Sequence, residues 1–393
     1  MALLPSEVVV TAENYRVLPG YRRFNQKHNT IMRCVWDPVF SRWTDRNAAT
    51  IARHVDQGDP GFDHFNYAFL TGAATVSASL GTSVNGPDSG LKSWSSLVAR
   101  SVHIFPAPER RLESPDPTDM RRRVERLARY FGADLVGFTD LDPRWLYSHH
   151  YLPRTGENPP VEIPEGCDQV IVMGVELARD LMETAPTAVM TGETSLNYSR
   201  MALLVASVAE FIRTLGYTAI PSTNDTALSV PLAVDAGLGQ PSRAGFVITP
   251  RYGPRVRWCK VITDLPLDAR RHQVDFGVIE FCQVCRRCVE ECPAKALPVG
   301  ERTTEGHNIS NNPGVLKWYA DYERCRKYWA TLGTNCGICM RVCPFNEGRG
   351  PHHEIVRGLV RLKVRPLNRL LVCLHRWLRL GRLRDPNRFW RDS

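Results

Sequence analysis

Eight of the twelve cysteines in this chain of 393 residues fall between Cys282 and Cys343. Four of them share the spacing C-x2-C-x2-C-x3-C before a proline, at Cys282, Cys285, Cys288 and Cys292. In this spacing three thiolates bind one iron–sulfur cluster, and the fourth binds the neighbouring cluster. Clustered cysteines in a chain of this length indicate a metal site, because disulfide scaffolds are short and evenly cross-linked.

A second run, C-x2-C-x3-C before a proline, follows at Cys336, Cys339 and Cys343, with Cys325 upstream. Two such runs predict two [4Fe–4S] clusters with crossed ligands. Cluster one takes Cys282, Cys285, Cys288 and Cys343. Cluster two takes Cys292, Cys325, Cys336 and Cys339. Cys325 is a remote ligand, so a three-iron second cluster without it is one alternative. Structural zinc and buried free cysteines are others, and both fit two cysteine–proline runs poorly.

The residues before these cysteines alternate between helix and strand patterns. Apolar residues recur at helical spacing in 120–131, 198–215 and 227–236, and a glycine ends each segment. Apolar runs at 170–175, 244–249 and 256–263 predict strands, and 250–254 predicts a turn between the last two. This alternation favours an α/β fold. We predict an N-terminal segment covering the core (1–114), an α/β core (115–275), a ferredoxin-like 2[4Fe–4S] domain (276–350) and a basic C-terminal tail (351–393).

Composition limits the setting of the protein. The chain has 50 Lys and Arg against 41 Asp and Glu, a net charge of +9. No apolar run approaches the roughly 20 residues that cross a bilayer, and no export leader is recognisable, so we expect a cytoplasmic protein. The tail interleaves Leu and Trp with Arg. We favour a helix packed on the body with a solvated basic face, and peripheral contact with a membrane surface is the alternative.

Three stretches of the chain resemble corrinoid-dependent reductive dehalogenases: NDTALSVPLAVDAGLGQPSRAGFVITPRYGPRVRWCKVITDLPL (224–267), YRRFNQKHNTIMR (21–33) and HNISNNPGVLKWY (307–319). The resemblance extends from about residue 15 to 390. It implies a nitroreductase-like core that holds cobalamin base-off beside two [4Fe–4S] clusters. The absence of a DxHxxG motif, whose histidine would ligate cobalt, agrees with that. It also implies that the clusters reduce cobalt to Co(I), which breaks a carbon–halogen bond of an aromatic or alkenyl organohalide, and that a proton replaces the halide.

Three residues match the catalytic positions of that family. The resemblance implies that Tyr198 donates the proton, that Arg257 tunes it, and that Asn224 lines the pocket. The chemistry is sensible, because a phenol has a pKa near 10 and a neighbouring cation favours phenolate. The alternatives are a packing tyrosine, an ordinary ion pair and a helix N-cap. Lys260 competes for the cationic role, but strand alternation places it on the face opposite Arg257.

Polar loops suggest where a phosphate-bearing corrinoid tail would bind, at Thr249, Tyr252, His307 and Asn308. Because no fused electron-transfer module is recognisable, we expect a separate electron donor, such as a ferredoxin, flavodoxin or reductase. Two other functions stay open. One is an epoxyqueuosine-reductase-type enzyme acting on tRNA, although the three candidate catalytic residues favour dehalogenation and we expect no nucleic-acid partner. The other is a non-catalytic electron carrier.

Overall fold

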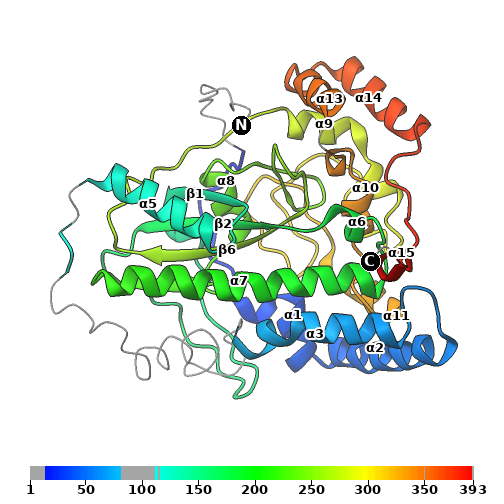
Figure 1. Ribbon diagram of the computed structural model, residues 1–393, viewed down its shortest axis with the longest axis horizontal. Helices are drawn as coiled ribbons and strands as arrows, with labels where there is room; N and C mark the ends of the chain where they lie inside the picture. Colours follow the sequence, from blue (N-terminus) through cyan, green and yellow to red (C-terminus); the bar gives the residue numbers. More distant parts are fainter. Residues whose placement is uncertain (1–13, 81–110, 114–115, 349, 392–393) are drawn as a thin grey trace.

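A four-stranded antiparallel sheet forms the centre of the molecule. The computed structural model describes residues 14–80, 111–113, 116–348 and 350–391. Within them the strands have the order β1-β2-β6-β3 (Figure 1). Their bounds are β1 (Leu135–Asp140), β2 (Gln169–Glu176), β6 (Val256–Thr263) and β3 (Ala219–Ser222). In the register Val175 lies opposite Arg257, and Val172 lies opposite Lys260.

Both faces of this sheet are covered. On one face α5 (Pro117–Tyr130) and the long helix α7 (Ala188–Thr214) pack against Cys259 and Val261 of β6. On the other face, α8 (Ser229–Asp235) and Trp145 in the short helix η3 (Pro143–Trp145) pack against Trp258 and Ile262. Alternate residues of β6 therefore face different helices. This alternation decides which polar residues of the strand can meet α7.

After η1 (Gln26–His28), the N-terminal helices are α1 (Thr30–Trp36), α2 (Pro38–Gln57) and α3 (His64–Leu80). Helix α3 covers the outer side of α7 (Figure 1), and α1 and α2 pack against α11 (Tyr322–Leu332). The approach is close at Gly192, where an added Cβ would lie 2.4 Å from the ring of Phe69. A small residue in α7 thus permits the two helices to pack.

The cysteine motifs lie on short helices and turns beside the core. These helices are α9 (Val278–Cys285), α10 (Arg287–Glu290), α11 (Tyr322–Leu332), α12 (Ile338–Arg341) and η4 (Pro344–Asn346). The chain ends with α13 (Pro351–Arg361), α14 (Arg365–Trp377) and α15 (Arg388–Arg391). Helix α14 packs on α9, and the indole of Trp390 donates to Asn66 of α3. None of the helices in the described ranges has the length and apolarity needed to span a bilayer.

Most of the predicted core elements are present, but strands β1 and β3 were not predicted, and two predicted features differ. Helix α7 begins ten residues earlier than the apolar pattern indicated, because Thr187 caps it and its first turns are buried. The chain does turn at 249–253, but the strands on either side do not pair with each other. β6 pairs with β2 along its whole length and with β3 over residues 260–263, whereas β5 (Val247–Ile248) pairs with β4 (Gln240–Pro241).

Candidate active site and cluster-binding cysteines

Tyr198, Arg257 and Asn224 come together from three different elements. Tyr198 lies on α7, Arg257 is the second residue of β6, and Asn224 lies in the loop between β3 and α8. The Asn224 side-chain amide donates to the Tyr198 hydroxyl at 3.0 Å. The Arg257 guanidinium carbon lies 5.7 Å from the centre of the Tyr198 ring, within cation–π range. One phenol is therefore held by an amide and faced by a cation.

Arg257 has a side-chain nitrogen that is available to a further hydrogen-bond acceptor. The side chain is half-buried, and its Nε is buried without a hydrogen-bond partner among the described residues. Buried polar groups are almost always paired in native proteins. An unpaired guanidinium nitrogen beside a phenol therefore fits a bound molecule that carries an acceptor or a negative charge.

Lys260 lies on the other face of β6, as strand alternation predicted. Its Nζ donates to the Thr223 carbonyl oxygen at 2.9 Å and lies 3.0 Å from the Ser229 hydroxyl. Burial lowers the pKa of Lys260 to about 8, and the charge of Asp225 partly opposes this. Lys260 therefore fixes the backbone of the 223–229 loop, and does not share the position of Arg257.

The 223–229 loop presents Asn224 and is held by polar contacts of its own. The Asp225 carboxylate accepts from the Thr223 backbone N–H at 3.0 Å and from the Ser222 hydroxyl at 3.2 Å. Leu228 occupies the N-cap of α8 and makes no side-chain cap. The alternative role of Asn224 as a helix N-cap is thus wrong, and its side chain is used on Tyr198.

Tyr147 is a further aromatic neighbour of this corner. It is buried, and its hydroxyl lies 3.5 Å from the Asn224 carbonyl oxygen. Burial raises the pKa of Tyr147, and the charges of Asp225 and Tyr198 add to the rise. Tyr147 therefore stays protonated and closes the corner behind Asn224.

The four predicted corrinoid contacts separate into two pairs. Thr249 and Tyr252 are buried in the turn before β6, where the Thr249 hydroxyl oxygen accepts from the Tyr252 backbone N–H at 2.9 Å. This turn packs closely against the end of the second cysteine motif. A Cβ added at Gly253 would lie 1.9 Å from the Phe345 carbonyl oxygen.

The other pair stabilises the loop between the cysteine motifs. His307 Nε2 lies 2.9 Å from the Tyr319 carbonyl oxygen, and the Asn308 amide donates to Asp321 at 3.2 Å. These contacts stay within the 303–321 segment, away from Tyr198.

The strongest thiol neighbours of Cys343, Cys339 and Cys325 agree with the crossed pattern. Burial raises the pKa of the Cys343 thiol, and Cys282, Cys285 and Cys288 raise it further. Burial likewise raises the pKa of the Cys339 thiol, with Cys325 and Cys336 as its strongest thiol neighbours. Burial also raises the pKa of the Cys325 thiol, and Cys336 and Cys292 raise it further. In this pattern Cys292 of the first motif belongs to the second group, and Cys343 of the second motif belongs to the first group.

The four cysteines of the first group, together with Cys339 of the second, line a cavity with a largely apolar wall. Its lining includes Phe281, Pro344 and Phe345 with Cys282, Cys285, Cys288, Cys339 and Cys343. Cysteine thiolates in apolar surroundings are the donor type that iron–sulfur clusters use, and the two motifs supply eight of them. The residues present therefore fit two cubane clusters.

Arg243 was not predicted from the sequence, and it joins the core to the first cysteine motif. It is 1% exposed. Its guanidinium donates to the carbonyl oxygens of Cys282 at 3.0 Å and Gly300 at 2.6 Å, and it lies over the ring of Trp318. It also places a positive charge beside Cys282 and Cys288. A single arginine between β4 and β5 carries no spacing signal, so sequence patterns could not single it out.

Known proteins share these features. Residues 281–346 match the 4Fe-4S double cluster binding domain family. The tetrachloroethene reductive dehalogenase of Sulfurospirillum multivorans is 39% identical over 303 residues, which cover 71% of this chain and 60% of that protein. The tetrachloroethene reductive dehalogenase of Dehalobacter restrictus is 33% identical over 306 residues, covering 68% and 55%. This chain belongs to the reductive dehalogenase family.

Solved structures of the family have the same fold. A reductive dehalogenase whose structure suggests a mechanism for B12-dependent dehalogenation is 28% identical, with a TM-score of 0.59 over 69% of this chain and 38% of that one. A catabolic reductive dehalogenase has a TM-score of 0.69 at 23% identity, over 95% and 48%. The epoxyqueuosine reductase of Lactococcus garvieae is 30% identical over only 38% of this chain. The chain spans about 60% or less of the length of the curated dehalogenases it matches.

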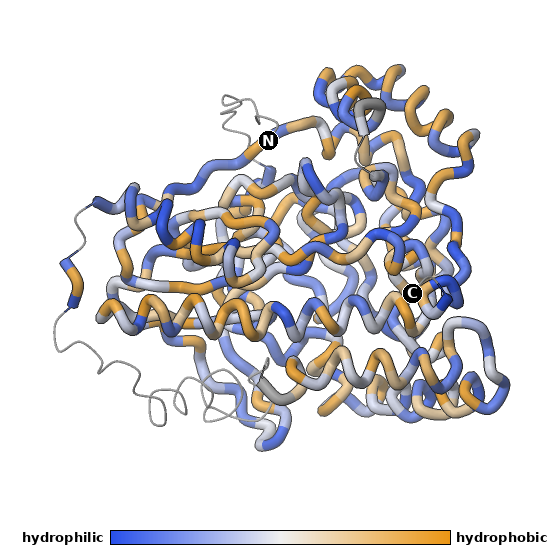
Figure 2. Tube along the Cα trace, viewed as in Figure 1, coloured by the Kyte–Doolittle hydropathy of each residue, from blue (hydrophilic) through white to orange (hydrophobic). Residues whose placement is uncertain are grey.

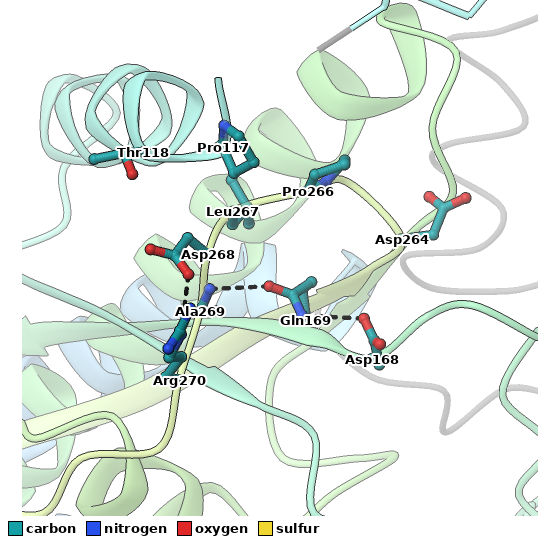
Figure 3. Close-up of a pocket in the computed structure, with 10 residues that line it drawn as sticks. All are labelled: Pro117, Thr118, Asp168, Gln169, Asp264, Pro266, Leu267, Asp268, Ala269 and Arg270. Carbon is teal, nitrogen blue, oxygen red and sulfur yellow. Dashed lines mark hydrogen bonds and ion pairs between the residues drawn. The ribbon is translucent and has the colours of Figure 1, made fainter. Parts of the chain in front are cut away.

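An open depression elsewhere on the molecule is not part of the candidate site. It has a volume of about 490 Å³ and lies between the start of α5 and the ends of β2 and β6 (Figure 3). Arg257 and Thr263 are at opposite ends of β6, which is about 20 Å at the rise of a strand. Asp264, at the rim, already accepts from Arg111 and the Thr218 backbone.

Proposed function

We propose that this chain replaces a halogen with hydrogen on an aromatic or alkenyl organohalide, using cobalamin and two [4Fe–4S] clusters. The net reaction consumes two electrons and one proton and releases a halide. The observation that carries the proposal is the Tyr198–Asn224–Arg257 corner, held in the same molecule as two groups of four cysteines. The similarity to tetrachloroethene reductive dehalogenases supports the reaction class.

The cysteines are the proposed route for electrons. Cys282, Cys285, Cys288 and Cys343 would hold cluster one, and Cys292, Cys325, Cys336 and Cys339 would hold cluster two. Each cluster passes one electron at a time. A separate electron donor, such as a ferredoxin, flavodoxin or reductase, would supply them. The basic segment 351–393 would make a peripheral contact with a membrane.

Cobalamin, when bound, supplies the low-valent cobalt that breaks the carbon–halogen bond. The residues of this chain supply the proton and stabilise the charges that form. Tyr198 gives its phenolic proton to the substrate carbon, and Asn224 keeps the hydroxyl oriented. Arg257 stabilises the phenolate that remains and offers charge to the departing halide. Thr249, Tyr252, His307 and Asn308 are the proposed corrinoid contacts, through the loops that their side chains fix.

The first experiment measures cofactor content and turnover. The chain is purified without oxygen, reconstituted with iron, sulfide and cobalamin, and assayed for iron, cobalt and halide release from tetrachloroethene and a bromophenol with a chemical reductant. We expect about eight iron and one cobalt per chain, and release of halide. Eight iron without cobalt would favour an electron carrier. Bound cobalt without halide release, but with turnover of epoxyqueuosine in tRNA, would favour the tRNA enzyme.

A further inference from the structure

The C-terminal segment carries nearly all of the net charge of the chain. Residues 351–393 contain eleven Lys and Arg against three Asp and Glu, a net charge of +8, whereas the whole chain has +9. Some of these cations are paired, as Arg376 is with Glu290 and Lys363 with Asp275. Five have side chains that make no hydrogen bond or ion pair with any described residue: Arg361, Arg365, Arg369, Arg379 and Arg382. The segment therefore has charge that the rest of the protein does not neutralise.

Helix α14 has two apolar faces. One face, with Leu371 and Val372, is buried against α9 and the first cysteine motif. A second stripe at positions i, i+4, i+7 and i+8 stays exposed, at Leu370, Leu374, Trp377 and Leu378. Trp377 is 77% exposed. Figure 2 shows apolar and hydrophilic residues alternating along both C-terminal helices at the outer end of the molecule.

Helix α13, which packs against α14, also carries exposed apolar residues. Ile355 and Val356 on that helix, and Leu362 and Val364 in the turn after it, are also exposed. A helix that only packs on the body leaves a polar face outside. Here the outer face combines Leu, Ile and Trp with unpaired guanidinium groups. That combination is the pattern of helices that lie in the interface of an anionic bilayer.

We propose that α13 and α14 dock on the surface of a bilayer containing anionic phospholipids. The stripe of Leu370, Leu374, Trp377 and Leu378 would enter the acyl boundary, while Arg365, Arg369 and Arg379 bind headgroup phosphates. The proposal deepens the membrane contact stated under the proposed function. The structure adds a consequence for orientation: because α14 covers α9, the first cysteine motif would face the membrane.

The test is sedimentation of the holoprotein with vesicles of phosphatidylcholine, with or without phosphatidylglycerol. We expect binding to the anionic vesicles that weakens with salt. Arg365→Gln with Arg369→Gln should weaken it about 25-fold, since each basic residue near the surface contributes roughly 5-fold. Leu374→Gln with Trp377→Gln should weaken it by at least about 10-fold.

Matched controls lie on α5, at the other end of the molecule (Figure 1). Arg122→Gln with Arg126→Gln removes two exposed charges at the same spacing, and Tyr130→Gln removes an aromatic ring that is 86% exposed. Neither should alter vesicle binding. Absence of wild-type binding, or equal losses in the controls, would overturn the proposal. So would loss of electron transfer from an acidic donor protein in the arginine variant without any vesicle binding.

Halide release in solution separates this proposal from the proposed function. It should be the same in the α14 variants and the wild type without vesicles, because these residues lie outside the candidate active site. Failure of halide release in all proteins would sink the enzyme and leave the docking surface standing.

Discussion

At the scale of single residues, the proton donor is the sharpest prediction. Tyr198→Phe removes one oxygen and keeps the ring against the sheet. We expect halide release to fall by a factor of about 10² to 10⁴, the usual contribution of a positioned acid. Iron and cobalt content should be unchanged, because Tyr198 is not among the residues that would hold the clusters or the corrinoid.

The matched control is Tyr217→Phe. Its hydroxyl donates to the Leu112 carbonyl oxygen, and its ring belongs to the same core cluster. Activity close to wild type in the control and in Tyr198→Phe alike would remove Tyr198 as the donor.

Lys260 gives a prediction about pH. Its pKa in the folded chain, about 8, is below its ordinary value of 10.5. Between these values the unfolded chain binds the proton and the folded chain does not, so for this group stability rises with pH. Function should change in the opposite direction, because the ammonium that holds the Thr223 carbonyl oxygen loses its charge.

We therefore expect kcat/KM to fall as the pH rises through about 8. Lys260→Met should lower kcat/KM roughly 10-fold or more near pH 7, since hydrogen bonds to charged groups contribute about 1.5–3 kcal/mol. It should also abolish the alkaline limb of the profile. Persistence of the same limb in Lys260→Met would show that another group titrates there.

At the scale of elements, the sequence was most informative where the relevant contacts are local. Cysteine spacing, the glycine that ends each helix and the alternation along β6 all act over a few residues, and the structure agrees with them. Long-range pairing was not visible. The pairing of β5 with β4 follows no local sequence pattern, and the role of Arg243 depends on carbonyls 39 to 57 residues away.

The crossed ligand sets give a prediction at this scale. Cys343 belongs to the second motif but lies with the first group, whereas Cys339 lies with the second. Cys343→Ala should therefore perturb cluster one, and Cys339→Ala cluster two, although only three residues separate them. Electron paramagnetic resonance of the reduced variants distinguishes the two signals.

Cys373→Ala is the control, because this exposed cysteine lies on α14 outside both groups. Loss of the same cluster signal in the Cys339 and Cys343 variants would contradict the crossed assignment.

At the scale of the whole molecule, one buried carboxylate connects three parts of the chain. Glu347 follows the second cysteine motif. It accepts from Arg179 of α6 (Arg179–Met182) at 2.8 Å and lies 3.1 Å from His375 of α14. Burial alone would raise its pKa, but the hydrogen bond and charge of His375, with Arg179, hold it below the ordinary value. Its stabilising effect is therefore present above pH about 4.5 and is lost as the pH falls through the lower folded pKa.

Glu347→Gln should loosen the docking of α14 at neutral pH. It removes the negative charge that faces Arg179 and His375. Arg179 keeps its ion pair with Glu183 at 2.9 Å, whereas the contact of His375 with a carboxylate is lost. Hydrogen bonds to charged groups contribute about 1.5–3 kcal/mol. Arg179 is partly exposed, so we expect the low end, or about tenfold faster amide exchange in residues 365–377. Glu354→Gln on α13 is the control, because that carboxylate is exposed and pairs only with Arg357 in the described structure. Equal exchange of α14 in both variants would mean that apolar packing on α9 alone holds the C-terminal helices. Faster exchange only in Glu347→Gln would mean that the cysteine domain, the core and the proposed membrane surface are held in one orientation by this ion network.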